Sequence, residues 1–133
     1  MVDYDLVPQK VIDTLFPEEN EYDETMMMSC KCKKISRWNI AQERILILST
    51  HFIYLLNEKH EVRKNQGIST LKYIVKSMAS LEILLYFTDE TDIRLQTDAA
   101  DKELFLQMLK LRFANLCPKV NLKVFGVPEE SLK

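Results

Sequence analysis

Basic side chains cluster around a single tryptophan in the first third of the chain. Between residues 31 and 44 the sequence holds five bases against one acid, a net charge of +4. The bases are Lys31, Lys33, Lys34, Arg37 and Arg44, and the tryptophan is Trp38. Lysine and arginine form strong, charge-assisted hydrogen bonds to phosphate, and tryptophan favours the interface between membrane and water. The cluster therefore predicts a site for an anionic membrane surface and its phosphate groups.

Two of these bases, Lys34 and Arg44, are predicted to share one concavity. Residues 26–34 alternate with a period of two, and Lys34 has the parity of Cys30 and Cys32, on the face expected to be buried. A lysine ammonium is not stable in a sealed core without a partner, so Lys34 should lie where the strand leaves the core. Arg44 begins the next strand at the same end, so a hairpin brings the two cations together at an open mouth.

The sequence leaves less specific explanations open for the same residues. A basic strand face is often simply solvated. Arg44 can pair locally with Glu43, and Trp38 can cover the edge of a core. Three bases on a later hairpin either widen the basic rim or belong to an ordinary polar turn: Lys59, Arg63 and Lys64.

Motifs of catalysis and metal binding are missing from the sequence. It holds no nucleophile elbow, no glycine-rich phosphate loop and no His-Glu-x-x-His motif. Cys30, Cys32 and Cys117 lack the spacing of a zinc site or a disulfide framework, and the first two fit a strand face as small core residues. His51 stands alone. We therefore predict a binding module that is not an enzyme and needs no metal or cofactor.

The distribution of charge bears on the choice of partner. The net charge is −2 and the isoelectric point about 5.7, which argues against nucleic acid. Residues 1–25 hold eight acids against one base. This acidic leader could cover the basic cluster in cis or bind a basic partner.

Hydrophobic periodicity divides the chain into a β-rich centre and two helices. A short helix is predicted over residues 8–16, ahead of Pro17. Six or seven short strands with period-two alternation follow up to Thr97. Asp98 can then cap a helix of roughly 16 to 18 residues. Residues 120–127 are predicted to form either a short strand or an extended linker. Such a strand would pair with a sheet edge within the chain or in another chain.

These elements predict a fold class that is mainly β with α. Strands joined by tight turns form a strongly bent antiparallel sheet or open barrel of about seven strands, and one C-terminal amphipathic helix caps it. We place the domain at residues 26–117, with a leader at 1–25 and an extension at 118–133. The sequence has no apolar run long enough to span a bilayer and no signal-peptide or myristoylation pattern at its start. A cytoplasmic location, at the membrane periphery or the cytoskeleton, is therefore expected.

A pattern between residues 32 and 55 resembles a known family. It consists of a lysine, a loop asparagine, an arginine, an apolar strand, a threonine and a Tyr-Leu strand: Lys34, Asn39, Arg44, Ile45–Leu48, Thr50, Tyr54 and Leu55. This resembles the tail homology 1 (TH1) domains of class I myosins and related pleckstrin-homology-like (PH-like) domains of protists. The resemblance implies a PH-like fold over about residues 6–116. It also implies a site for phosphoinositide headgroups at Lys34 and Arg44, with Gln42 in place of the middle base.

Two classes of function follow. The first is a membrane-targeting module that binds anionic phospholipids through the basic cluster. The alternative is a PH-superfold protein-interaction or scaffold domain of a cytoskeletal or motor-associated assembly, without lipid binding. Such a domain would take a peptide between its last helix and an exposed strand.

Overall fold

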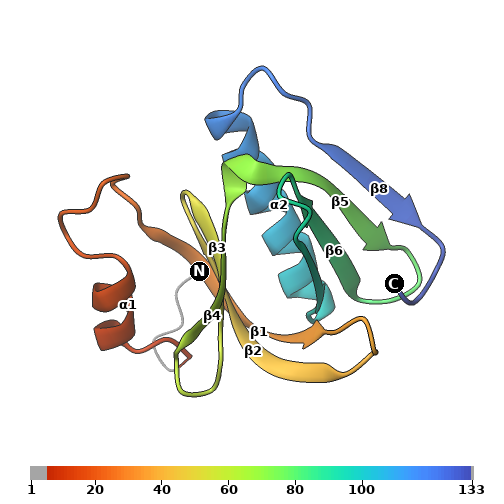
Figure 1. The fold of residues 1–133 in the computed structure, drawn as a ribbon, viewed down its shortest axis with the longest axis horizontal. Coiled ribbons are helices and arrows are strands. Elements are labelled where there is room, and N and C mark those ends of the chain that lie inside the picture. Colours follow the sequence, from red (N-terminus) through yellow and green to blue (C-terminus); the bar gives the residue numbers. More distant parts are fainter. Residues whose placement is uncertain (1–5, 133) are drawn as a thin grey trace.

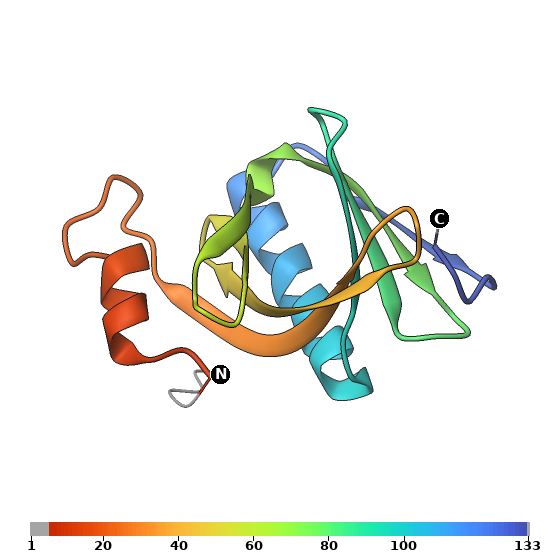
Figure 2. The same cartoon turned by 60° about the horizontal axis from the view of Figure 1, so that its bottom comes forward.

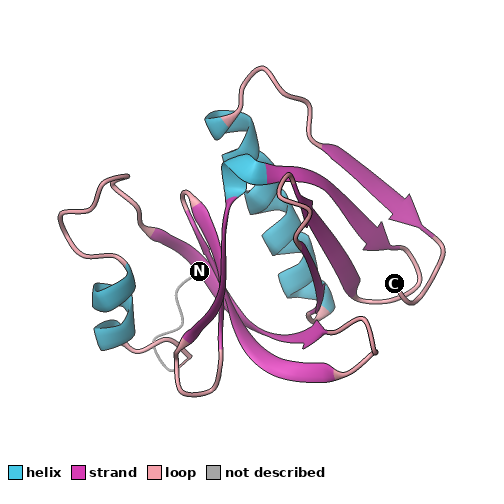
Figure 3. Ribbon diagram, viewed as in Figure 1, coloured by secondary structure: helices cyan, strands magenta, loops and turns pink. Residues whose placement is uncertain are grey.

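The computed structural model describes residues 6–132, which form two α-helices, a 3₁₀ helix and eight strands (Figures 1 and 3). The helices are α1 (Gln9–Leu15), η1 (Ile68–Thr70) and α2 (Ala99–Leu116). The strands are β1 (Met26–Ile35), β2 (Ala41–Ser49), β3 (Phe52–Leu56), β4 (Val62–Gly67), β5 (Leu71–Ser77), β6 (Glu82–Phe87), β7 (Asp92–Gln96) and β8 (Lys123–Val127). The predicted order of short helix, strands, long helix and tail is confirmed.

All eight strands belong to one sheet, in the order β4-β3-β2-β1-β7-β6-β5-β8. Neighbouring strands are antiparallel except β8, which runs parallel to β5. β1 and β7 share only two residue pairs, Lys33 with Gln96 and Lys34 with Leu95. The sheet bends into an open barrel, which Figure 2 shows from a second direction. The predicted fold class is therefore confirmed, with eight strands in place of about seven because the tail adds one.

The main core lies between the inner face of the sheet and α2. Its fully buried members include Leu46, Leu55, Ile83, Phe87, Phe105 and Leu109. Asp98 caps α2 as predicted, because its carboxylate accepts a hydrogen bond from the Asp101 N–H at 2.8 Å. The buried Lys102 ties α2 to the β5–β6 turn by donating to the carbonyls of Ser77 and Ser80 at 2.8 and 2.9 Å.

A second apolar cluster covers the outer face of β2 and β3. The leader packs on this face through α1, and the cluster includes Val7, Ile12, Phe16, Ile47, Tyr54 and Leu56. The simple alternation predicted for β1 is wrong at its start. A bulge between Met26 and Met28 shifts the register, and Met26 packs in this outer cluster while Met28 stays in the main core.

The tail after α2 pairs within the chain as β8. Its residues Lys123–Val127 lie in parallel register with Tyr73–Ser77 of β5. The hydroxyl of Ser80 donates to the Glu130 carbonyl at 2.6 Å. The last described residues therefore pass along the β5–β6 turn. Within residues 6–132, neither helix combines the length and the hydropathy needed to cross a bilayer.

Candidate functional site

A groove of about 610 Å³ opens at the mouth of the barrel, where β1 leads into the β1–β2 loop. Its walls come from β1, this loop, β4, β6, β7 and the tail. It is lined by Lys34, Ile35, Ser36, Arg37, Trp38, Lys64, Leu84, Asp92, Arg94 and Leu132. Four of these side chains are basic and one is acidic, so the groove suits an anionic ligand.

Lys34 and Lys64 reach the groove from two strands that are not neighbours in the sheet. Lys34 pairs with Gln42 across β1 and β2, and Lys64 pairs with Leu55 across β3 and β4. Within residues 6–132, neither ammonium forms an ion pair or donates a hydrogen bond. Burial lowers the pKa of Lys34, and the positive charges of Lys64 and Arg44 lower it further. Both lysines would therefore gain from an anion bound between them.

Ser36 holds the β1–β2 loop in one conformation. Its hydroxyl accepts hydrogen bonds from the N–H groups of Trp38 and Ile40, each at 3.2 Å. Asn39 has a φ of 60°, which asparagine tolerates better than most residues. The loop therefore presents two apolar side chains to solvent, Trp38 at 74% and Ile40 at 59% exposure. The guanidinium of Arg37 lies 5.6 Å from the centre of the Trp38 ring.

A buried ion pair between Arg94 and Glu82 supports this end of the barrel. Nε of Arg94 donates to Oε1 of Glu82 at 2.6 Å, and Nη2 donates to Oε2 at 3.0 Å. Nη1 donates to Oδ1 of Asn39 at 2.7 Å, which ties the β1–β2 loop to β7. Burial acts to raise the pKa of Glu82. The hydrogen bonds from Arg94 and from the Leu132 N–H outweigh it and hold this pKa below its usual value.

Three of the six predicted site residues meet in the groove: Lys34, Arg37 and Trp38. Arg44 lies beside the groove, and its charge acts on Lys34. Its guanidinium donates to the carbonyl of Glu43 at 2.8 Å. This contact within one strand leaves most of the positive charge of Arg44 uncompensated.

Lys31 and Lys33 lie on the other face of β1. Both are exposed, and Lys33 pairs across the strands with Glu43. They line a separate shallow hollow that also includes Asp98. Because successive side chains of a strand alternate, these two lysines are directed away from the groove.

Two basic residues of the groove lie outside the predicted set. Lys64 belongs to the hairpin for which the sequence left two explanations open, and it lines the groove whereas its neighbour Arg63 does not. β4 is polar on both faces, so its sequence carries no alternation to show this. Arg94 stands between the apolar Ile93 and Leu95. That alternation by itself predicts an arginine on the solvent face, so the sequence carried no signal of its burial against Glu82.

The end of the acidic leader, at Glu24, lies at the far end of β1 from the groove. Glu24 is buried, and its carboxylate accepts hydrogen bonds from the hydroxyls of Ser49 and Tyr54, the latter at 2.7 Å. Eight residue steps of strand, roughly 27 Å, separate Met26 from Lys34. At its other end the leader returns to the basic cluster, because Leu6 lines a hollow together with Lys31 and Arg44. Covering of the cluster in cis stays a prediction. The remaining acids of the leader, Asp3 and Asp5, lie outside the described residues.

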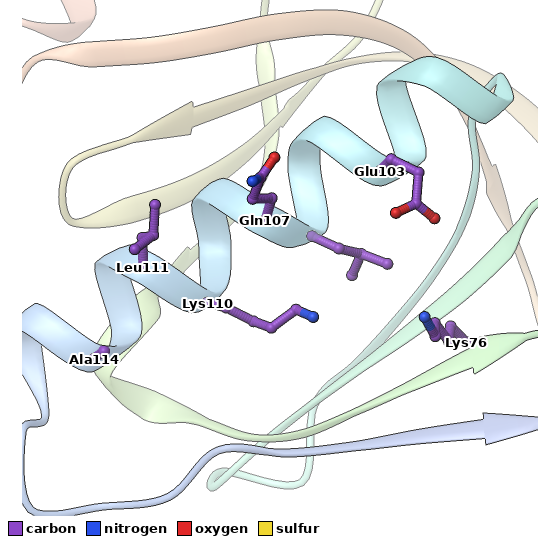
Figure 4. A pocket seen from close by; sticks show the side chains of 7 residues that line it. Lys76, Glu103, Gln107, Lys110, Leu111 and Ala114 are labelled. Atoms are coloured by element: carbon purple, nitrogen blue, oxygen red, sulfur yellow. The ribbon is translucent and has the colours of Figure 1, made fainter.

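A second hollow of about 490 Å³ lies between α2 and β5 (Figure 4). It is lined by Lys76 of β5 and by Glu103, Leu106, Gln107, Lys110, Leu111 and Ala114 of α2. Figure 4 shows Glu103 and Lys110 extending from the helix into the gap. Because its charges are mixed, this hollow is less suited to an anion than the groove is.

Cys30 and Cys32 are buried thiols on the inner face of β1. Burial raises the pKa of Cys30 and of Cys32 to about 12, so both thiols are protonated at neutral pH. In the part of the chain that the structure describes, no three His, Cys, Asp or Glu side chains are grouped to hold a metal ion. Cys30 and Cys32 belong to the main core.

No protein-family model and no curated protein matches the chain, but solved structures do. The chain is similar to the hSac2 domain of the human phosphoinositide phosphatase Sac2. The TM-score is 0.64 at 12% identity, over 100% of this chain and 95% of that one. It is also similar to the Slm1 PH domain in complex with inositol-4-phosphate, with a TM-score of 0.57 at 11% identity over 66% of this chain and 96% of that one.

A third similar structure holds the linker-DH/PH domains of p115-RhoGEF. The TM-score is 0.62 at 11% identity over 81% of this chain, which spans about a third (34%) of that longer chain. At these identities the likeness concerns the fold alone. The chain has a PH-like fold, and this prediction is confirmed.

Proposed function

We propose that this PH-like domain is a non-catalytic membrane-targeting module that binds anionic phospholipids through the groove at the barrel mouth, with phosphoinositide headgroups as candidate ligands. One observation carries the proposal. Among residues 6–132, Lys34 and Lys64 have no ion-pair partner, and both line a groove beside the exposed Trp38. Two uncompensated ammonium groups next to an apolar tip suit a phosphate at the surface of a bilayer.

Each part of the groove has its own role in this proposal. A phosphate between Lys34 and Lys64 would relieve their repulsion, while Arg37 and Arg44 would add long-range attraction of about 1 kcal/mol each near an anionic leaflet. Trp38 and Ile40 would enter the interfacial region, where an indole ring is favoured. The Slm1 PH domain, which has the same fold, was solved with inositol-4-phosphate, and this supports the choice of ligand.

Trp38 provides the test, because it is the only tryptophan in the chain. Its fluorescence would be recorded with neutral vesicles, with phosphatidylserine vesicles, and with vesicles that carry phosphatidylinositol bisphosphate at equal total charge. We expect a blue shift with both anionic sets that weakens as salt is added. A stronger response to the phosphoinositide would indicate a headgroup site, since the charge is matched.

Charge reversal locates the site. Lys34→Glu and Lys64→Glu should abolish the blue shift, whereas Lys110→Glu on α2 changes the net charge equally and should leave it intact. Absence of a response to every vesicle, or an equal loss in all three variants, would contradict the proposal. The first result would favour protein interaction.

The alternative is a protein-interaction or scaffold domain in a cytoskeletal or motor-associated assembly. The hollow between α2 and β5, with the exposed Leu111 at its rim, favours a peptide there. The finer likeness to TH1 domains, the cytoplasmic and peripheral location and the division at residues 26–117 stay predictions.

A further inference from the structure

The outer face of the second half of the sheet carries an aromatic cluster. The rings of Tyr73 on β5 and Tyr86 on β6 stack with centroids 4.9 Å apart, and Phe125 on β8 meets Tyr73 edge-on at 5.9 Å. Phe125 is 47% exposed. α2 packs on the inner face of the sheet and α1 packs on the outer face of β2 and β3. Neither helix covers this cluster.

The strand register arranges charges at the two sides of the cluster. Asp92 pairs with Tyr86, Tyr86 with Tyr73, and Tyr73 with Lys123. Side chains of directly paired residues lie on the same face. They therefore form one row that reads acid, tyrosine, tyrosine, base, with its ends roughly 14 Å apart across three strand spacings.

The neighbouring row begins at Arg94, which pairs with Leu84 and whose guanidinium is held by Glu82, and the rest of the row is apolar. Leu84 pairs with Val75, and Val75 pairs with Phe125. The face thus has an aromatic and apolar centre, with a carboxylate on one side and an ammonium on the other. The ammonium of Lys72 also lies 5.6 Å from the centre of the Tyr86 ring.

We propose that this face binds a second copy of the chain across a twofold axis that runs parallel to the strands. Such an axis reverses the row, so that Asp92 of each copy faces Lys123 of the other and the apolar centres meet. A twofold axis perpendicular to the strands and in the plane of the interface would place like charges together. The row is complementary to itself in one orientation, which favours a second copy over an unrelated partner.

The size of the face sets the expected strength of the dimer. Four strands at about 4.8 Å spacing and five residues at about 3.3 Å give a face of roughly 320 Å² in projection. Stable interfaces bury about 800 Å² on each partner. The dimer should therefore be weak and dependent on concentration.

One consequence rests on the proposed function. Asp92 is the single acid among the described residues that line the groove. Because Asp92 and Leu84 belong both to this face and to the lining of the groove, a second copy would cover that side of the groove, so dimer formation and membrane binding should oppose each other.

Sedimentation velocity from micromolar to millimolar concentration tests the proposal without lipid, and so separately from the proposed function. Phe125→Glu should weaken the dimer at least tenfold. Asp92→Lys and Lys123→Asp should each weaken it about fivefold, and the double variant should return to within about twofold of the parent. Leu111→Glu changes an exposed leucine on α2 and should have no effect.

Circular dichroism would confirm that each variant is folded. A monomer at every concentration would overturn the proposal. So would a dimer whose affinity Phe125→Glu leaves unchanged. The same holds for a double charge variant whose loss of affinity equals the combined losses of the two single variants.

Discussion

Two sets of charged side chains meet at the mouth of the barrel and differ in how their charges are balanced. The three guanidinium nitrogens of Arg94 all donate hydrogen bonds, to Glu82, Asn39 and Ser131. Lys34 and Lys64 line the same groove, and within residues 6–132 their ammonium groups have no acceptor. Arg94 therefore has all its partners within the described residues, whereas Lys34 and Lys64 have none there.

The difference separates the part that holds the site in shape from the part that contacts a ligand. A buried arginine is stable only when paired, so Arg94 connects β6, β7, the β1–β2 loop and the tail into one support. A partly buried lysine beside another cation destabilises the free protein slightly, and an anion would reverse that effect. Substitutions in the two sets should therefore affect different measurements.

The largest effect is expected for Arg94→Met. Removal of one partner from a buried ion pair typically costs 3–5 kcal/mol, and we expect the free energy of unfolding to fall by about 3 kcal/mol. Urea denaturation would measure it. Replacing Glu82 by Met in the same chain should recover part of the loss, because no buried carboxylate is then left unpaired. A loss below about 1 kcal/mol would show that the pair does not support the groove.

Lys34→Met should weaken ligand binding without lowering the stability of the fold. Vesicle binding should weaken about tenfold, equivalent to one charge-assisted hydrogen bond, while the free energy of unfolding stays level or rises slightly. The pKa of Lys34 is lowered in the folded state, so the unfolded chain binds more protons. The protonated lysine therefore reduces stability, and the reduction disappears as the pH rises from the folded pKa to the unfolded one.

Unfolding measurements from neutral to alkaline pH would test this prediction for Lys34. The rise in stability at alkaline pH should be smaller in Lys34→Met than in the parent. Lys102→Met is the matched control, because the Lys102 ammonium has two carbonyl acceptors and its removal should destabilise the fold. A clear loss of stability in Lys34→Met would mean that Lys34 has a partner within the fold.

A smaller effect is expected from titration of Glu82. Its pKa is lowered in the folded state, so its contribution to stability is complete above the unfolded pKa and is lost as the pH falls through the folded pKa. Acid unfolding should therefore be less steep in Glu82→Gln than in the parent. Equal pH dependence of unfolding in the two proteins would contradict the assigned pairing.

The alternation of side chains is what allowed the fold and part of the site to be predicted. Period-two apolar positions in β1 and the continuous apolar run of β2 identified strands, and the parity of Lys34 placed its ammonium at the mouth of the barrel. The same rule would have separated Lys34 from Lys31 and Lys33, which have the opposite parity. Grouping the bases by distance along the chain put all three in one site.

The remaining parts of the site depend on contacts between distant segments. Lys64 sits on a strand without apolar alternation, so only its pairing with Leu55 shows which way it faces. The Arg94–Glu82 pair depends on the register of β6 and β7. Ser131 and Leu132 reach it from a tail that has no periodicity of its own. None of these contacts follows from local sequence, because each is set by long-range strand pairing.

The smallest effect is expected from the double variant Lys31→Gln with Lys33→Gln, which removes two charges from the outer face of β1. These lysines lie on the face opposite the groove, and Glu43 stands directly across the strands from Lys33. At physiological salt, where screening acts over about 8 Å, vesicle binding should fall less than threefold. A larger fall than in Lys34→Met would place the lipid on the outer face of β1, because two screened charges would then outweigh one in the groove. A small fall in vesicle binding that becomes larger at low salt would show that Lys31 and Lys33 act by long-range attraction alone. Lys34 and Lys64 would then be the lysines that contact the phosphate.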